Sequence, residues 1–115
     1  MTEFYFIYKL FCKTNPKQFY IGSTKDLYSR ISQHKSSCKK NNSKLYSFIR
    51  NNGGFKNFEF KTLIYKYSIE DKVLERKSIE ELHISICKPT LNTAKIYRTE
   101  FPDFKKLRKK LKCFS

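Results

Sequence analysis

Residues 4–12 read FYFIYKLFC, and this stretch decides the fold. Aromatic and β-branched residues occupy both alternating sets of positions, which is typical of a strand that is buried on both faces and therefore central in its sheet. The turn-forming sequence TNPKQ follows at 14–18, and FYIGS at 19–23 predicts a second strand. Together the two strands predict a hairpin.

Two helices are expected next. Residues 26–36 place Leu27 and Ile31 four positions apart, which is the spacing of one helix face. After a polar loop, Ser43 is a suitable N-cap for a short helix, and Asn-Gly-Gly at 52–54 ends it.

The remaining pattern adds one strand and one long helix. Residues 57–67 alternate in polarity as a third strand. The sequence SIED at 68–71 resembles a capping box that opens a helix to about Cys87, and Lys88-Pro89 ends this helix. The fold class is therefore α+β, a small three-stranded antiparallel sheet flanked by helices in the order β-β-α-α-β-α. Apolar residues at helical spacing over 104–113 predict a basic C-terminal helical tail.

Length and composition exclude several classes of protein. A chain of 115 residues has room for one core. Its apolar runs are too short to span a membrane, and no secretory signal is visible. The four cysteines are far apart and form no zinc-binding pattern, so reduced thiols are expected, in an intracellular, reducing compartment with cytoplasm or nucleus left open.

The chain is strongly basic, with a formal net charge of +15. Lys outnumbers Arg, which AT-rich codon usage explains in part, but this bias does not explain why acidic residues are so few. A small body with this charge needs a polyanion or counterions. Nucleic acid is the favoured partner; a membrane surface or an acidic protein is the alternative.

Three features carry possible chemistry. Tyr8 and Tyr20 lie on the paired strands, although a chain rich in Tyr also places several in its core. Arg30 and His34 are one helical turn apart, and an Arg can grip a phosphate with two parallel hydrogen bonds; a solvated helix face is the alternative. Glu80 and Glu81 follow on the long helix, where a carboxylate could hold a hard cation with substrate phosphate, or be a surface group without function.

The order and spacing of these motifs resemble the GIY-YIG nuclease superfamily over residues 4–92. Phe6-Ile7-Tyr8 stands for the first motif, with Phe6 in place of its Gly, and Tyr20-Ile21-Gly22 for the second. The block IEELHI at 79–84 and Lys88 to Asn92 is similar to the metal-binding helix and closing Asn of stand-alone members in large DNA viruses and Penelope-type retroelements.

The resemblance implies a metal-dependent DNA endonuclease with a nuclease domain at 1–95 and a basic tail at 96–115. It implies that Tyr8 accepts a proton from the attacking water, Tyr20 positions the nucleophile and Arg30 clamps the phosphate. His34 would share in proton transfer or orient Tyr8. Glu80 would hold one Mg²⁺, or Mn²⁺, and is preferred over Glu81 because it lies twelve residues before Asn92.

DNA is the expected partner, and the sequence indicates no membrane and no partner protein. The residues expected to contact DNA are Lys25, Arg30, Asn92, Lys105, Arg108 and Lys109. The tail could lie along the DNA backbone or be a solvated basic face. An inactive nucleic-acid-binding module of the same fold, or a basic RNA-packing protein, are the competing functions.

Overall fold

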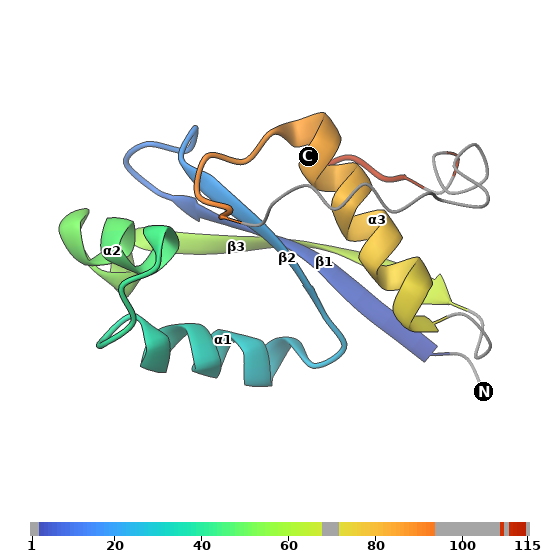
Figure 1. Ribbon diagram of the computed structural model, residues 1–115, viewed down its shortest axis with the longest axis horizontal. Coiled ribbons are helices and arrows are strands. Elements are labelled where there is room, and N and C mark those ends of the chain that lie inside the picture. The colour runs from blue at the N-terminus through green and yellow to red at the C-terminus, as the bar shows by residue number, and fades with distance from the viewer. Residues whose placement is uncertain (1–2, 68–71, 94–108, 110, 115) are drawn as a thin grey trace.

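The computed structural model describes residues 3–67, 72–93, 109 and 111–114. Its elements follow the predicted α+β order (Figure 1). They are β1 (Glu3–Cys12), β2 (Phe19–Thr24), α1 (Leu27–Ser37), α2 (Lys44–Asn51), the 3₁₀ turn η1 (Phe55–Asn57), β3 (Phe58–Tyr67) and α3 (Lys72–Cys87). The turn η1 was not predicted. It includes Asn57, so the third strand begins one residue later than expected.

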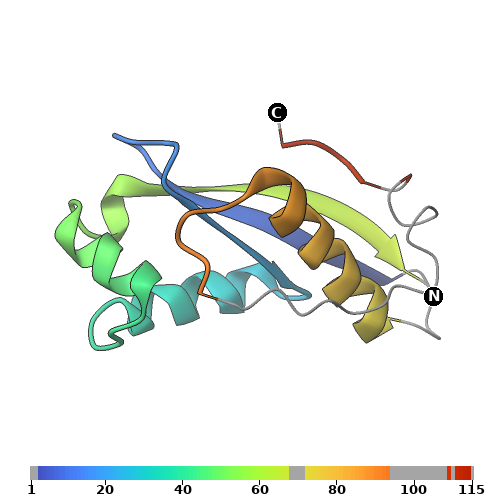
Figure 2. The same cartoon turned by 45° about the horizontal axis from the view of Figure 1, so that its top comes forward.

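The three strands form one antiparallel sheet in the order β2-β1-β3, which confirms that β1 is central. Because side chains alternate along a strand, β1 supplies two separate cores. One face of the sheet packs under α1 and α2 and is called the α1–α2 face; the other packs under α3 and is called the α3 face (Figure 2). The α1–α2 face buries Tyr8, Leu10, Cys12, Leu45 and Ile49, and the α3 face buries Tyr5, Ile7, Ile21, Ile79 and Leu82.

The helix ends follow the capping rules. Asp26 caps α1 by accepting a hydrogen bond from the Ser29 backbone N–H, and Ser43 caps α2 as predicted. Gly53 and Gly54 have φ angles of 92° and 78°, the left-handed region in which glycine is favoured, and they end α2 as predicted. The capping box expected at 68–71 lies outside the described residues.

After α3, the chain turns at Lys88, whose φ is 50°, and runs along the outer edge of β2. The Leu91 backbone N–H donates to the Phe19 carbonyl at 3.0 Å. The Asn92 side chain bonds both backbone groups of Ile21: its Nδ2 donates to the carbonyl at 2.8 Å, and its Oδ1 accepts from the N–H at 2.9 Å. These bonds satisfy backbone groups at an otherwise open sheet edge.

The described end of the tail packs against the α3 face. Leu111 and Phe114 contact its core, and the Lys112 backbone N–H donates to the Tyr65 hydroxyl at 2.8 Å. Residues 111–114 are not helical, so the expectation of a helix to residue 113 is wrong there. Residues 104–108 lie outside the described part. None of the described helices is long and apolar enough to cross a membrane, and all four cysteines are free.

Candidate active site

Tyr8 and Gly22 face each other across β1 and β2. A Cβ at position 22 would come within 2.5 Å of the Tyr8 Cζ, so only glycine leaves room for the phenol to lie across the strand. The Tyr20 ring also lies beside Tyr8, with ring centroids 6.1 Å apart. The two phenols are therefore brought together by the hairpin, as the sequence suggested.

His34 connects α1 to the tyrosines. Its Nε2 lies 2.8 Å from the Tyr8 hydroxyl oxygen, and its Nδ1 lies 2.8 Å from the hydroxyl oxygen of Tyr46 on α2. Only 3% of His34 is exposed, so it does not belong to a solvated helix face. Burial and the Arg30 charge lower the pKa of His34 to about 4, so the ring is neutral near pH 7. A neutral imidazole has one donor and one acceptor nitrogen, which fits two hydroxyl partners.

Arg30 lies half-buried one turn before His34. Its Nη2 donates to the Ser23 carbonyl at 3.4 Å, and its Nη1 donates to the Gln33 Oε1 at 3.0 Å. Its Nε is buried and has no hydrogen-bond partner within the described part of the chain. An unpaired buried donor is costly, and a phosphate oxygen is an acceptor that would satisfy it.

Burial raises the pKa of both phenols. For Tyr8, burial has the largest effect and the nearby Tyr20 adds to it, whereas the Arg30 charge lowers the pKa. Arg30 also lowers the pKa of Tyr20. Tyr8 is therefore a neutral phenol near pH 7, and Arg30 is the cation that favours negative charge around it.

Glu80 reaches the same site from α3. Burial raises the pKa of its carboxyl, while a hydrogen bond with Ser23 and the charges of Arg76 and Arg30 lower it. Glu80 in turn raises the pKa of Tyr8 and Tyr20. The carboxyl is thus electrostatically coupled to both phenols and to Arg30.

Sequence reasoning missed two neighbours of this site. Tyr46 holds the second nitrogen of His34, and Arg76 lies one helical turn before Glu80 and favours the ionised form of its carboxyl. The spacing of Arg76 and Glu80 was available in the sequence as an i, i+4 pair of opposite charges. The contact between Tyr46 and His34 could not be predicted from the sequence, because it depends on how α2 packs against α1.

The residues predicted to contact nucleic acid have different positions. Lys25 is exposed and lies between β2 and the N-cap of α1, and Lys109 is exposed in the tail. The Asn92 amide is used on Ile21, so it ties the segment after α3 to β2. Lys105 and Arg108 lie outside the described residues. A role of these residues in DNA binding stays a prediction.

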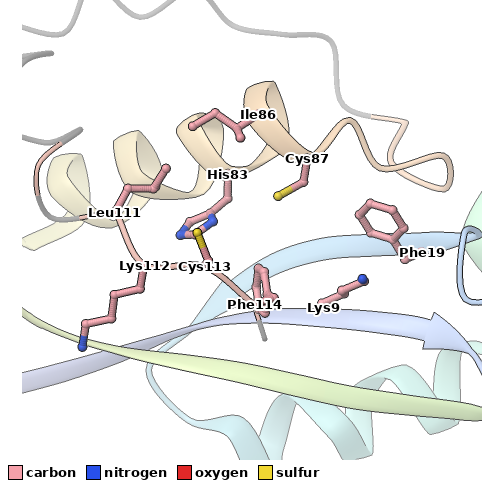
Figure 3. Close-up of a pocket in the computed structure, with 9 residues that line it drawn as sticks. All are labelled: Lys9, Phe19, His83, Ile86, Cys87, Leu111, Lys112, Cys113 and Phe114. Atoms are coloured by element: carbon pink, nitrogen blue, oxygen red, sulfur yellow. The ribbon is translucent and has the colours of Figure 1, made fainter.

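A cavity of about 260 Å³ lies elsewhere, on the α3 face (Figure 3). Its walls include His83, Cys87, Cys113 and Phe114, and none of the five predicted catalytic residues lines it. His83 there forms a second buried pair with a tyrosine, its Nε2 lying 2.7 Å from the Tyr65 hydroxyl oxygen. This pair is separated by the sheet from Tyr8 and His34.

The fold and the site define a small α+β domain with two strand tyrosines, an arginine and a helix carboxylate around one edge strand. A family model, the GIY-YIG catalytic domain, matches residues 4–86. The chain therefore belongs to the GIY-YIG family and has a nuclease-type domain whose substrate is a nucleic acid. Comparisons with curated proteins and with solved structures gave no match.

Proposed function

We propose that this chain is a metal-dependent DNA endonuclease that hydrolyses phosphodiester bonds by in-line attack of water. The observation that carries the proposal is the 2.8 Å contact between the Tyr8 hydroxyl and Nε2 of a neutral, buried His34. A phenol is a poor base by itself. The contact places a nitrogen of His34 where it can accept the phenol's own proton.

In the proposed step, the attacking water gives its proton to the Tyr8 hydroxyl oxygen as Tyr8 passes its own proton to Nε2 of His34. The water oxygen forms a bond to phosphorus, and the bond from phosphorus to O3′ breaks with its electron pair left on O3′, which is protonated from solvent. His34 then returns its proton to the Tyr8 oxygen, and Tyr8 releases the proton that it took from the water to solvent. Tyr20, beside Tyr8, orients the attacking water.

Arg30 supports this step by binding the phosphate. Its unpartnered Nε and the guanidinium fork donate to non-bridging oxygens as negative charge increases in the transition state. Tyr46 keeps the His34 ring oriented through Nδ1. Each group thus has one role that its contacts support.

Glu80 is the residue that would hold a divalent cation. Within the described residues, no group of three or more His, Cys, Asp or Glu side chains could hold a metal by itself. A lone carboxylate beside a phosphate clamp fits Mg²⁺ or Mn²⁺, because such ions complete their shell with substrate phosphate and water. When bound, such an ion stabilises negative charge on the leaving oxygen.

The test is incubation of the full chain with supercoiled plasmid, with Mg²⁺ or with excess EDTA. The proposal expects nicked and linear plasmid with Mg²⁺ only, and loss of both products for Tyr8→Phe. A chain that retards plasmid in a gel, yet leaves it supercoiled and cuts no flap-containing duplex with every divalent ion, would be a binding module of the same fold instead. Cleavage of RNA but not of DNA would show that the proposed substrate is wrong, while the proposed hydrolysis would still hold.

A further inference from the structure

One end of the α1–α2 face is apolar and open. Phe6 and Phe4 follow Tyr8 along β1 at two-residue steps, so their side chains are on the same face as the Tyr8 phenol. Ile64 on β3 pairs with Phe6 and shares this face. These three residues, Phe4, Phe6 and Ile64, are called the apolar platform.

The helices leave the platform uncovered. Cys12 and Leu10, at the other end of the face, are buried under α1 and α2, whereas Phe4 and Ile64 are 45% and 49% exposed. Figure 1 shows the start of β1 and the end of β3 extending past α1. Of the four large apolar side chains that are exposed in the described residues, two therefore lie together here.

The platform is continuous with the site. Two residues of a strand span about 7 Å, so Phe6 and Phe4 lie about 7 and 13 Å from Tyr8 along β1. Phe6 also pairs with Thr24, the last residue of β2, and the chain enters α1, which carries Arg30, three residues later at Leu27. If Arg30 binds one phosphate of a DNA strand, the next few nucleotides of that DNA strand are within reach of the platform.

The chemistry of the platform selects one kind of occupant. The outside of duplex DNA is phosphate and sugar, whereas an unpaired base offers an aromatic face that stacks on Phe side chains. The platform has a cationic neighbour, because the exposed Lys66 pairs with Phe4 across the strands. A second copy of a chain with net charge +15 would be repelled at low salt, so charge favours nucleic acid over a homodimer.

We propose that the apolar platform binds unpaired bases next to the scissile phosphate, so that the substrate class is DNA with a single-stranded segment at the cut, such as a flap or a bubble. This rests on the proposed function in taking nucleic acid as the ligand. The aromatic Phe6, where the family motif has glycine, is then a specificity residue of this chain.

The test compares affinities of the full chain for a labelled single-stranded oligonucleotide and for its duplex, by fluorescence anisotropy in EDTA at one salt concentration. Phe4→Ala should weaken single-strand binding by about fivefold or more, the lower end of what one stacked base contributes, and change duplex binding by less than about twofold. Phe4→Tyr keeps the ring and should restore the affinity.

Ile64→Ala and Ile86→Ala form a matched pair, because both isoleucines are about half exposed, at 49% and 51%, and Ile86 lies on α3 away from the platform. Ile64→Ala should weaken single-strand binding and Ile86→Ala should not. Thermal unfolding of each variant identifies any change in affinity that comes from loss of the fold.

The inference is overturned if Phe4→Ala and Ile64→Ala leave single-strand affinity unchanged, or weaken both DNAs equally. It is also overturned if the wild type sediments as a dimer that Phe4→Ala dissociates, because the platform would then bind a second copy. The binding test needs no cleavage. Platform-dependent binding without hydrolysis would reject the proposed function alone, and hydrolysis without platform dependence would reject this inference alone.

Discussion

The phenol of Tyr8 occupies the space that a side chain at position 22 would need: a Cβ there would lie within 2.5 Å of the Tyr8 Cζ. Gly22→Ala should therefore displace the phenol from His34 and reduce DNA cleavage strongly. Overpacking of this kind costs about 1–3 kcal/mol, so the fold should survive with a lower melting temperature.

Gly54→Ala is the control for this loss of stability. Position 54 has open space around it but a φ of 78°, so alanine there is strained without touching the site. The control should lose stability by about 1 kcal/mol and keep its cleavage rate. Equal cleavage by the Gly22→Ala variant and the wild type would contradict the assigned position of Tyr8.

Arg30→Lys tests the phosphate clamp. Lysine keeps the charge but loses the fork and the buried Nε, so we expect turnover to fall on the order of a hundredfold while DNA affinity changes little. Arg50→Lys is the matched control, because Arg50, which lies on α2, also donates to backbone carbonyls, those of Cys38 and Asn41 between α1 and α2. Single-turnover cleavage rates of both variants test this prediction. A wild-type rate for Arg30→Lys would show that only the charge of Arg30 matters and that its guanidinium fork does not bind the phosphate.

The two buried histidines predict how stability depends on pH. Burial lowers the pKa of His83 to about 4, and burial together with Arg30 lowers that of His34 to about 4. The unfolded chain titrates near the ordinary value of about 6.5, so between pH 6.5 and 4 it binds more protons than the folded chain. The free energy of unfolding should therefore be fully present above pH 6.5 and fall as the pH is lowered through this window.

Urea unfolding at a series of pH values measures this dependence. His83→Gln removes one titrating group away from the site and keeps an acceptor for the Tyr65 hydroxyl, so its stability should fall less steeply between pH 6.5 and 4. A wild-type stability that is flat or rises on acidification would show that these rings are not held neutral.

The tail is better tested by charge than by truncation. Leu111 and Phe114 pack on the core of the α3 face, so removing the tail would also expose that core. Replacing Lys105, Arg108 and Lys109 by Gln keeps both contacts and lowers the formal charge from +15 to +12, since three cations are removed. If these cations contact phosphates, the slope of log affinity against log salt should flatten by about two to three units. An unchanged slope would leave the tail as a solvated face.

Much of this architecture is predictable because it follows local rules. Both alternating faces of residues 4–12 are apolar, and β1 is indeed the strand between two cores. The Asn-Gly-Gly stop after α2 and the Ser43 cap follow from backbone chemistry alone. The family motifs in turn identified residues that the structure brings to one edge strand.

The remaining features depend on contacts between residues far apart in the chain. Tyr46 bonds His34 because α2 packs beside α1, and Lys112 bonds Tyr65 across the α3 face. The turn η1 depends on how Gly53 and Gly54 redirect the chain before β3, which composition does not specify. Arg76 could have been found from its spacing to Glu80, but only the position of Glu80 at the site gives that spacing meaning.

The central claim is that Glu80, rather than its neighbour, completes the site of Tyr8 and Arg30. The most direct measurement is the rate of supercoiled plasmid nicking in Mg²⁺ by Glu80→Ala and Glu81→Ala side by side, with DNA affinity measured for each. We expect Glu80→Ala to nick no plasmid while binding DNA as well as the wild type or slightly better, since a negative charge is removed from the binding face. We expect Glu81→Ala to nick at nearly the wild-type rate. An active Glu80→Ala beside an inactive Glu81→Ala would place the metal carboxylate one residue later and contradict the account.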